Sequence, residues 1–135
     1  MKASLTAGVS ATSKLTVDRD RTISFMGEKA RVYATPMLVR DIEMASRELL
    51  LRHLDPGEDS VGTRVELDHL AATLLGMPVE LKVTVAEISG RSVTLEVEGR
   101  DSVEVICRGK HRRFVVEVKT TEERLAAKAR KAGLA

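Results

Sequence analysis

An acidic side chain among apolar neighbours is the first residue whose type and place could support chemistry. Glu43 lies in the segment TPMLVRDIEMASRELLLRHL, residues 35–54, on the flank of an apolar helical face. A carboxylate at such a border could enter a cleft, where partial burial would tune its pKa for acid, base or nucleophilic work. The spacing equally allows a surface ion pair with Arg40 or Arg47, worth about 0.2–0.5 kcal/mol. Spacing alone leaves both interpretations open.

The three histidines and the single cysteine differ in how well their surroundings suit chemistry. His69 follows a Gly-containing turn in strand-like sequence, which makes it the best candidate for a catalytic imidazole, with a structural role as the alternative. His53 is expected near the end of the helix, where the helix dipole favours positive charge. His111 lies in the basic run RGKHRR, which suits a solvated strand end, with a position facing a ligand as the alternative. Cys107 shows no sign of thiolate activation and is expected to be a small buried apolar residue.

A long helix is predicted over residues 35–54 and would carry Glu43. Its apolar positions advance by four, three and four residues, the spacing of one helical face, and they are Leu38, Ile42, Ala45 and Leu49. Thr35 suits the N-cap because its hydroxyl can accept a hydrogen bond from a free amide, and Pro36 suits the first helical position. The sequence DPG at 55–57 ends the helix. A capping role alone would account for the Thr35 hydroxyl.

Strand signals follow the helix. Residues 79–86 alternate apolar and polar side chains, residues 93–97 repeat the pattern after a turn, and residues 103–118 form a longer third run. A further strand is expected within residues 61–73. Gly109 lies where the apolar phase of the third run shifts, which predicts a β-bulge. Consecutive runs separated by short turns predict antiparallel hairpins.

The ends of the chain complete the predicted architecture. Residues 1–13 are small and polar and are expected to be a flexible tail, followed by a short strand at 15–17. Residues 120–133, TTEERLAAKARKAG, are typical of a short amphipathic helix. One long helix needs a surface to cover its apolar face, and a curved antiparallel sheet wrapped around it provides that surface. The sequence therefore predicts an α+β domain of hot dog type over residues 14–135.

Composition narrows the class of protein. With 135 residues, 43% of them hydrophobic and 31% charged, the chain suits one domain with a sizeable core. Only 2% of the residues are aromatic, and the 22 basic and 20 acidic residues are spread along the chain, which argues against a nucleic-acid partner. The single cysteine excludes an intramolecular disulfide, and the sequence lacks a run of about 18 apolar residues. A cytoplasmic protein without a membrane partner is expected.

Several segments, taken in order with their spacing, resemble a known family. They are ATPMLVRDIEMA, LDPGEDSVGT and HLAATLLG, followed by strands and GKHRRFVV. Together they resemble the hot dog thioesterases typified by fluoroacetyl-CoA thioesterase, over roughly residues 15–130. The motif DPGE alone would not be specific. The ordered set is fairly specific.

The resemblance implies a set of site residues. The family's catalytic threonine, the glutamate eight residues later and the histidine after the following turn correspond to Thr35, Glu43 and His69. The family's backbone contact to the thioester corresponds to Gly62, and its substrate-contacting arginine to Arg113. The sequence does not choose between Glu43 as the nucleophile and Glu43 as the group that orients water. It also leaves Thr35 open as nucleophile or hydrogen-bonding organiser.

The same resemblance implies an activity. It implies hydrolysis of a short-chain acyl-CoA to free acid and CoA, by a homodimer with a continuous sheet and without a cofactor or metal ion. A hot dog module that binds acyl-CoA or another ligand without turnover is the alternative, and a hydratase or dehydratase is a third. The family's aromatic lid is replaced here by FMGEKARVY, in which Phe25 and Tyr33 bracket charged residues. We therefore expect no large preference for a fluorinated ester.

Overall fold

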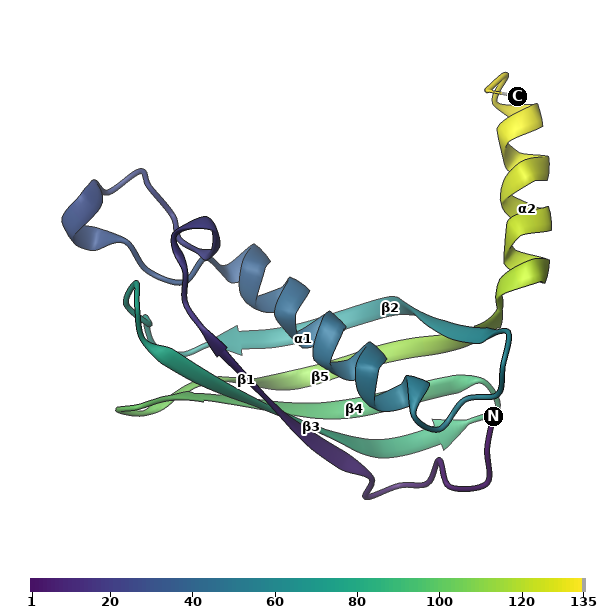
Figure 1. Ribbon diagram of the computed structural model, residues 1–135, viewed down its shortest axis with the longest axis horizontal. Coiled ribbons are helices and arrows are strands. Elements are labelled where there is room, and N and C mark those ends of the chain that lie inside the picture. The colour runs from purple at the N-terminus through teal and green to yellow at the C-terminus, as the bar shows by residue number, and fades with distance from the viewer. Residues whose placement is uncertain (135) are drawn as a thin grey trace.

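A five-stranded antiparallel sheet with one long helix across its face makes up the body of the computed structural model, which describes residues 1–134 (Figure 1). The main elements are β1 (Ser10–Thr16), α1 (Thr35–Leu51), β2 (Glu58–His69), β3 (Pro78–Ser89), β4 (Ser92–Asp101), β5 (Val105–Glu117) and α2 (Val118–Lys131). Two short 3-10 turns, Arg19–Arg21 and Glu28–Ala30, lie between β1 and α1. The strand order is β1-β3-β4-β5-β2, so β1 and β2 form the edges.

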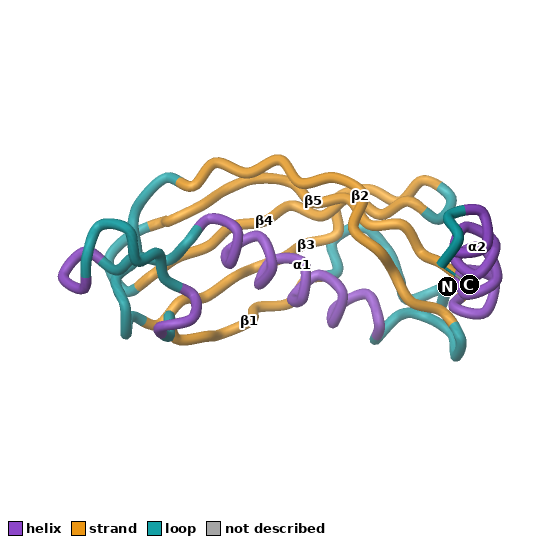
Figure 2. Tube along the Cα trace, turned by 90° about the horizontal axis from the view of Figure 1, so that it is seen from above, coloured by secondary structure: helices purple, strands orange, loops and turns teal. Residues whose placement is uncertain are grey.

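The core lies between α1 and the sheet. The apolar positions predicted for α1 are all buried, and so are the alternating positions of β3 and β4; they are Leu38, Ile42, Ala45, Leu49, Val79, Leu81, Val83, Val85, Val93, Leu95 and Val97. Each fully buried Val, Leu or Ile side chain contributes about 1.5–3 kcal/mol relative to an exposed one. Figure 2 shows α1 lying along the sheet. This arrangement confirms the predicted α+β hot dog fold.

The start of α1 differs from the prediction. The N-cap residue is Ala34, and Thr35 is already the first residue of the helix, with Pro36 in its first turn. The Thr35 hydroxyl hydrogen-bonds His69 and caps no amide of the helix. The helix also ends at Leu51, three residues before the predicted end. The threonine that suited a cap is therefore free for another role.

The irregularities of the sheet lie elsewhere than predicted. The β5 register runs without a shift through Gly109, which faces Val97 on β4 and Leu67 on β2. The expected bulge at Gly109 is therefore wrong, and the nearby shifts lie between Gly62 and Arg64 and between Gly99 and Arg100. A Cβ atom at Gly109 would stand 2.0 Å from the carbonyl oxygen of Glu66. Glycine is needed there for close strand packing.

Part of the N-terminal segment that was expected to be a flexible tail pairs with the sheet and packs into the core. The first strand begins at Ser10, inside the stretch expected to be a flexible tail, and pairs with β3 from Ser10 to Thr16. Leu5 is buried in the core as well. The strand SATSKLT alternates mostly small polar side chains at a sheet edge, so it gives little hydrophobic signal.

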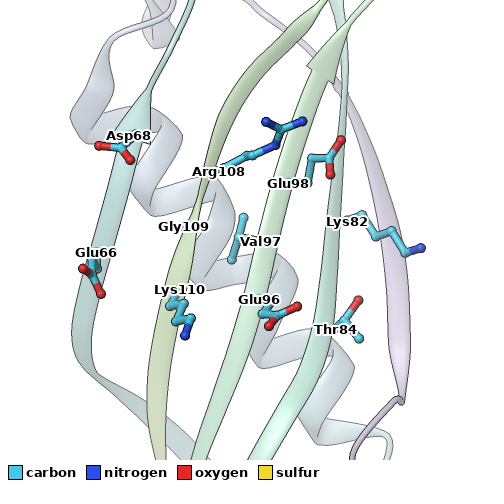
Figure 3. Close-up of a pocket in the computed structure, with 10 residues that line it drawn as sticks. All are labelled: Glu66, Asp68, Lys82, Thr84, Glu96, Val97, Glu98, Arg108, Gly109 and Lys110. Carbon is cyan, nitrogen blue, oxygen red and sulfur yellow. The ribbon is translucent and has the colours of Figure 1, made fainter.

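The sheet face opposite α1 carries charged side chains (Figure 3). Neighbouring strands place Asp68, Arg108, Glu98 and Lys82 side by side, with opposite charges facing each other across each pair of strands. A hollow of about 590 Å³ lies among these and adjacent side chains. The apolar surface of the sheet is thus directed mainly toward α1.

The last helix stands apart from the sheet. α2 begins at Val118, two residues before the predicted start, and none of its residues is buried. Figure 1 shows α2 projecting from the end of β5, away from the strands. Within residues 1–134, no helix has the length and apolar character needed to cross a membrane.

Candidate active site

A threonine and a histidine meet at the N-terminal end of α1. Thr35 opens this helix and His69 ends β2, and the Thr35 Oγ1 lies 2.7 Å from the His69 Nδ1. The other ring nitrogen, Nε2, is buried without a hydrogen-bond partner among residues 1–134. Burial lowers the pKa of His69 from its ordinary value of 6.5. The imidazole is therefore neutral near pH 7, and its Nε2 makes no hydrogen bond within residues 1–134.

A buried polar network formed by Tyr33, Asp41 and Arg21 adjoins the Thr35 and His69 pair. The Tyr33 ring packs edge-on against the His69 ring, with centroids 6.5 Å apart. The Tyr33 hydroxyl donates to Asp41, and Arg21 donates to the same carboxylate through Nε at 2.8 Å and Nη2 at 3.2 Å. The network ties the segment before α1 to the helix itself. It fixes the backbone that presents Thr35.

An apolar pocket of about 610 Å³ opens beside the Thr35 and His69 pair. Its lining comes from the segment before α1 and from the turn after β2, and includes Ile23, Phe25, Val32, Leu70 and Ala71. Ligand pockets of this kind pair apolar walls with a few polar groups that fix orientation. The walls suit an apolar part of a ligand, and Thr35 and His69 supply polar groups at one end of the pocket.

Glu43 lies in a different part of the chain's surface. Glu43 forms neither of the surface ion pairs that the spacing allowed, with Arg40 or with Arg47. Arg47 donates to Asp59, and the cation that lies against Glu43 is Arg113, whose Nη1 is 3.6 Å from the Glu43 Oε2. The Glu43 side chain is 43% exposed, whereas the Arg113 side chain is only 5% exposed. A Cβ atom at Gly62 would lie 3.0 Å from the Glu43 Oε2. The missing side chain of Gly62 thus leaves the carboxylate accessible.

Arg113 is held by buried acceptors. Its Nε donates to the Ser60 Oγ at 2.7 Å, its Nη2 to the Ser60 carbonyl at 2.8 Å, and its Nη1 to the His111 Nε2 at 3.1 Å. His111 is 1% exposed, so the expected solvated strand end is wrong for this residue. Its inward direction could have been found from the alternation in RGKHRRFVV, which places His111, Arg113 and Val115 on one face.

The expected site residues therefore form two separate groups, Thr35 with His69 and Glu43 with Gly62 and Arg113, which we call half-sites. Thr35 and Glu43 are eight residues apart on α1, which corresponds to roughly 12 Å along the helix axis. His69 and Gly62 are seven residues apart on β2, a separation of roughly 23 Å along an extended strand. The structure brings Thr35 to His69 and Glu43 to Gly62 and Arg113. It does not bring all three expected catalytic residues together within one chain.

The remaining candidates lie outside these half-sites. Cys107 is buried, and burial raises the pKa of its thiol to about 11, in keeping with the expected apolar role. The ring of His53 hydrogen-bonds the Ser4 hydroxyl at 2.8 Å. Within the described part of the chain, no group of three His, Cys, Asp or Glu side chains is placed to hold a metal ion.

Comparison with known proteins connects this geometry to a family. Residues 17–119 match the family model of the fluoroacetyl-CoA-specific thioesterases. The fluoroacetyl-CoA thioesterase of Streptantibioticus cattleyicolor is 33% identical over 103 residues, which cover 76% of this chain and 71% of that protein.

Two solved structures extend the similarity to the fold. The fluoroacetyl-CoA thioesterase FlK superposes with a TM-score of 0.84 and 27% identity, covering 92% of this chain and 97% of that one. A thioesterase superfamily member from Thermus thermophilus superposes with a TM-score of 0.88 and 25% identity, covering 98% and 99%. The chain belongs to the fluoroacetyl-CoA-specific thioesterase family, and with it to the hot dog thioester hydrolases.

Proposed function

We propose that this chain hydrolyses short-chain acyl-CoA esters to free acid and CoA with Thr35, Glu43 and His69 as its catalytic set. The observation that carries the proposal is the hydrogen-bonded pair of Thr35 and His69, which both line an apolar pocket at a helix N-terminus. The His69 Nε2 has no hydrogen-bond partner among residues 1–134. Membership of a thioesterase family supports the same reaction. The neutral, partly buried imidazole suits proton transfer near neutral pH.

The proposed reaction adds water across the C–S bond of the thioester. Where water or the Thr35 hydroxyl attacks, His69 takes its proton and passes a proton to the departing CoA thiolate. Where the Glu43 carboxylate attacks, it carries no proton, so CoA leaves as the thiolate, and His69 takes its proton from the water of the second step. Glu43 either attacks the carbonyl, giving a mixed anhydride that water then opens, or orients the attacking water. Pro36 has no amide hydrogen, and the amides of Met37 and Leu38 donate to the Ala34 carbonyl. The Thr35 amide at the start of α1, or the backbone at Gly62, therefore holds the oxyanion. Thr35 acts as nucleophile or as the partner that fixes the His69 ring.

The separation of the half-sites supports a site shared by two copies of the chain. β2 is an edge strand that exposes Val61 and Val65, and an unpaired edge can pair with a second copy. A symmetric pairing centred between Val65 and Glu66 would set Gly62 of one copy opposite His69 of the other. Glu43 of one copy would then face Thr35 and His69 of the other, and each dimer would hold two sites.

A homodimer is the first expected result. Sedimentation at micromolar concentration should give a species of twice 14.8 kDa, because pairing through β2 satisfies the edge and covers its exposed valines. Replacing Val65 with lysine should weaken the dimer, since it places a charge at the centre of the proposed pairing. A wild-type chain that sediments as a monomer would contradict the shared site.

Fluorine selectivity is the second expectation. Phe25 lines the pocket but is 81% exposed, and the Tyr33 hydroxyl is bound to Asp41, so neither ring closes over a small acyl group. Fluoroacetyl-CoA should therefore have no large advantage over acetyl-CoA in kcat/KM. An advantage of several orders of magnitude, measured by thiol release from the two esters, would show that another element encloses the fluorinated group.

A screen of thiol release tests the activity and identifies the acyl group. The purified chain is supplied with acetyl, branched, aryl and halogenated CoA esters, and free CoA is followed. We expect catalytic release from at least one short ester. Saturable binding without thiol release would indicate a ligand-binding module, and loss of enoyl-thioester absorbance without thiol release would indicate a hydratase.

A further inference from the structure

His111 links the backbone of β2 to the guanidinium that faces Glu43. Its Nδ1 lies 2.8 Å from the Arg64 carbonyl oxygen, and its Nε2 lies 3.1 Å from the Arg113 Nη1. A carbonyl can only accept a hydrogen bond and a guanidinium can only donate one. The contacts therefore fix a neutral imidazole with its proton on Nδ1 and its lone pair on Nε2.

The same contacts fix the direction of the arginine. Ser60 accepts from the Nε and Nη2 of Arg113, and His111 accepts one of the two protons on Nη1. The Nη1 atom is also the one that lies 3.6 Å from the Glu43 Oε2. His111 thus shares a single nitrogen of Arg113 with the proposed catalytic carboxylate.

The imidazole also lies against the backbone that the substrate would meet. A Cβ atom at Gly62 would stand 3.2 Å from the His111 Cε1 and 3.0 Å from the Glu43 Oε2. The ring, the carboxylate and the glycine therefore converge on one small volume. Burial lowers the pKa of His111, the hydrogen bond to the Arg64 carbonyl opposes that change, and the smaller effects of the Arg113 and Glu43 charges lower and raise the pKa respectively.

We infer that His111 is a positioning residue, which acts through Arg113 to hold the Glu43 carboxylate in its reactive orientation beside Gly62. This inference rests on the proposed function of Glu43. The Arg113 side chain is only 5% exposed and donates to Ser60 and His111, so its guanidinium fixes Glu43 by charge. Without an acceptor at position 111, Nη1 loses one of its fixed contacts and Glu43 gains rotational freedom.

Two substitutions separate a positioning role from a packing role. His111→Leu keeps apolar volume but removes both hydrogen bonds, whereas His111→Gln keeps an amide oxygen able to accept from Arg113. We expect His111→Leu to lower kcat roughly 10-fold with little change in KM, and His111→Gln to restore most of the loss. His53→Gln, at a histidine outside the site, is the matched control and should keep wild-type kinetics. Equal losses in the Leu and Gln variants, or full activity of both, would overturn the inference.

The effect of His111→Leu on kcat in a Glu43→Gln background distinguishes a positioning role from a packing role. If His111 acts through Glu43, His111→Leu should cause no further loss of kcat in that background. An undiminished roughly 10-fold loss there would show that His111 acts by another route and would overturn the inference.

Nitrogen NMR of the wild-type chain separates failure of this inference from failure of the proposed function. The spectrum should show His111 protonated at Nδ1 and unprotonated at Nε2 at neutral pH. A proton on Nε2 overturns the inference whatever the activity. A chain with the expected tautomer that releases no thiol from any ester overturns the proposed function, and with it the role of His111 in hydrolysis.

Discussion

Replacing Glu43 with glutamine should lower thioester hydrolysis by roughly 10²-fold or more, equivalent to about 2.7 kcal/mol on the barrier. The substitution keeps the shape of the side chain but removes the charge and the nucleophilic oxygen. Arg113 keeps its contacts with Ser60 and His111, and the Glu43 side chain is 43% exposed, so solvent screens the lost ion pair. The free energy of unfolding should therefore change by less than about 1 kcal/mol.

The matched control for this prediction lies on the same helix. Glu48 is exposed on α1 and takes no part in either half-site, so Glu48→Gln should retain wild-type turnover. Initial rates of thiol release and thermal melting are measured for both variants. A Glu43→Gln protein that melts like the wild type and hydrolyses at near-wild-type rate would leave Glu43 a surface residue only.

His69→Ala should cause a loss of similar size, roughly 10²-fold. The imidazole is the neutral base in the proposed reaction, and its removal also leaves the Thr35 hydroxyl without its 2.7 Å partner. Combined with Glu43→Gln, the loss should be smaller than the product of the two single effects, because residues that act as one unit are not additive. Multiplicative losses in the double variant would indicate independent roles.

The same residue sets the expected acid limb of the pH profile. Hydrolysis needs neutral His69, so the rate should be constant above the pKa of His69 and fall as the pH drops through it. Burial lowers that pKa from 6.5, which places the fall below pH 6.5. If lowering the pH halves the rate while the pH is still above 7, His69 is not the group that sets this acid limb.

The parts of the fold with strong periodicity could be predicted from sequence. The four-three-four spacing of Leu38, Ile42, Ala45 and Leu49 located α1, and the alternation around Val83 and Leu95 located β3 and β4. β1 was placed too late because an edge strand of small polar residues has little apolar signal. The bulge expected at Gly109 is wrong. The glycine is there because the backbone of Glu66, on the neighbouring strand, leaves no room for a side chain, and a contact between segments distant in the sequence gives no local signal.

The identities of the candidate site residues could also be predicted from the sequence, but their arrangement could not. The resemblance to the family predicts five site residues, because the motifs that carry them occur in the same order and with similar spacing in this sequence. They are Thr35, Glu43, His69, Gly62 and Arg113. Which of them meet depends on how α1 lies against β2, and spacing along the chain does not report that. His111 was missed because its neighbours are basic, and a basic run suggests solvent until the alternation of β5 is considered.

Mixing two inactive variants tests the shared thioesterase site most directly. Glu43→Gln and His69→Ala chains are denatured together, refolded and assayed for thiol release against each variant refolded alone. A mixed dimer has one site in which intact Glu43 faces intact His69, and half of randomly formed dimers are mixed. Activity should therefore recover to about a quarter of the wild-type value. A mixture no more active than its separate components would contradict a site built from Glu43 of one copy and His69 of the other.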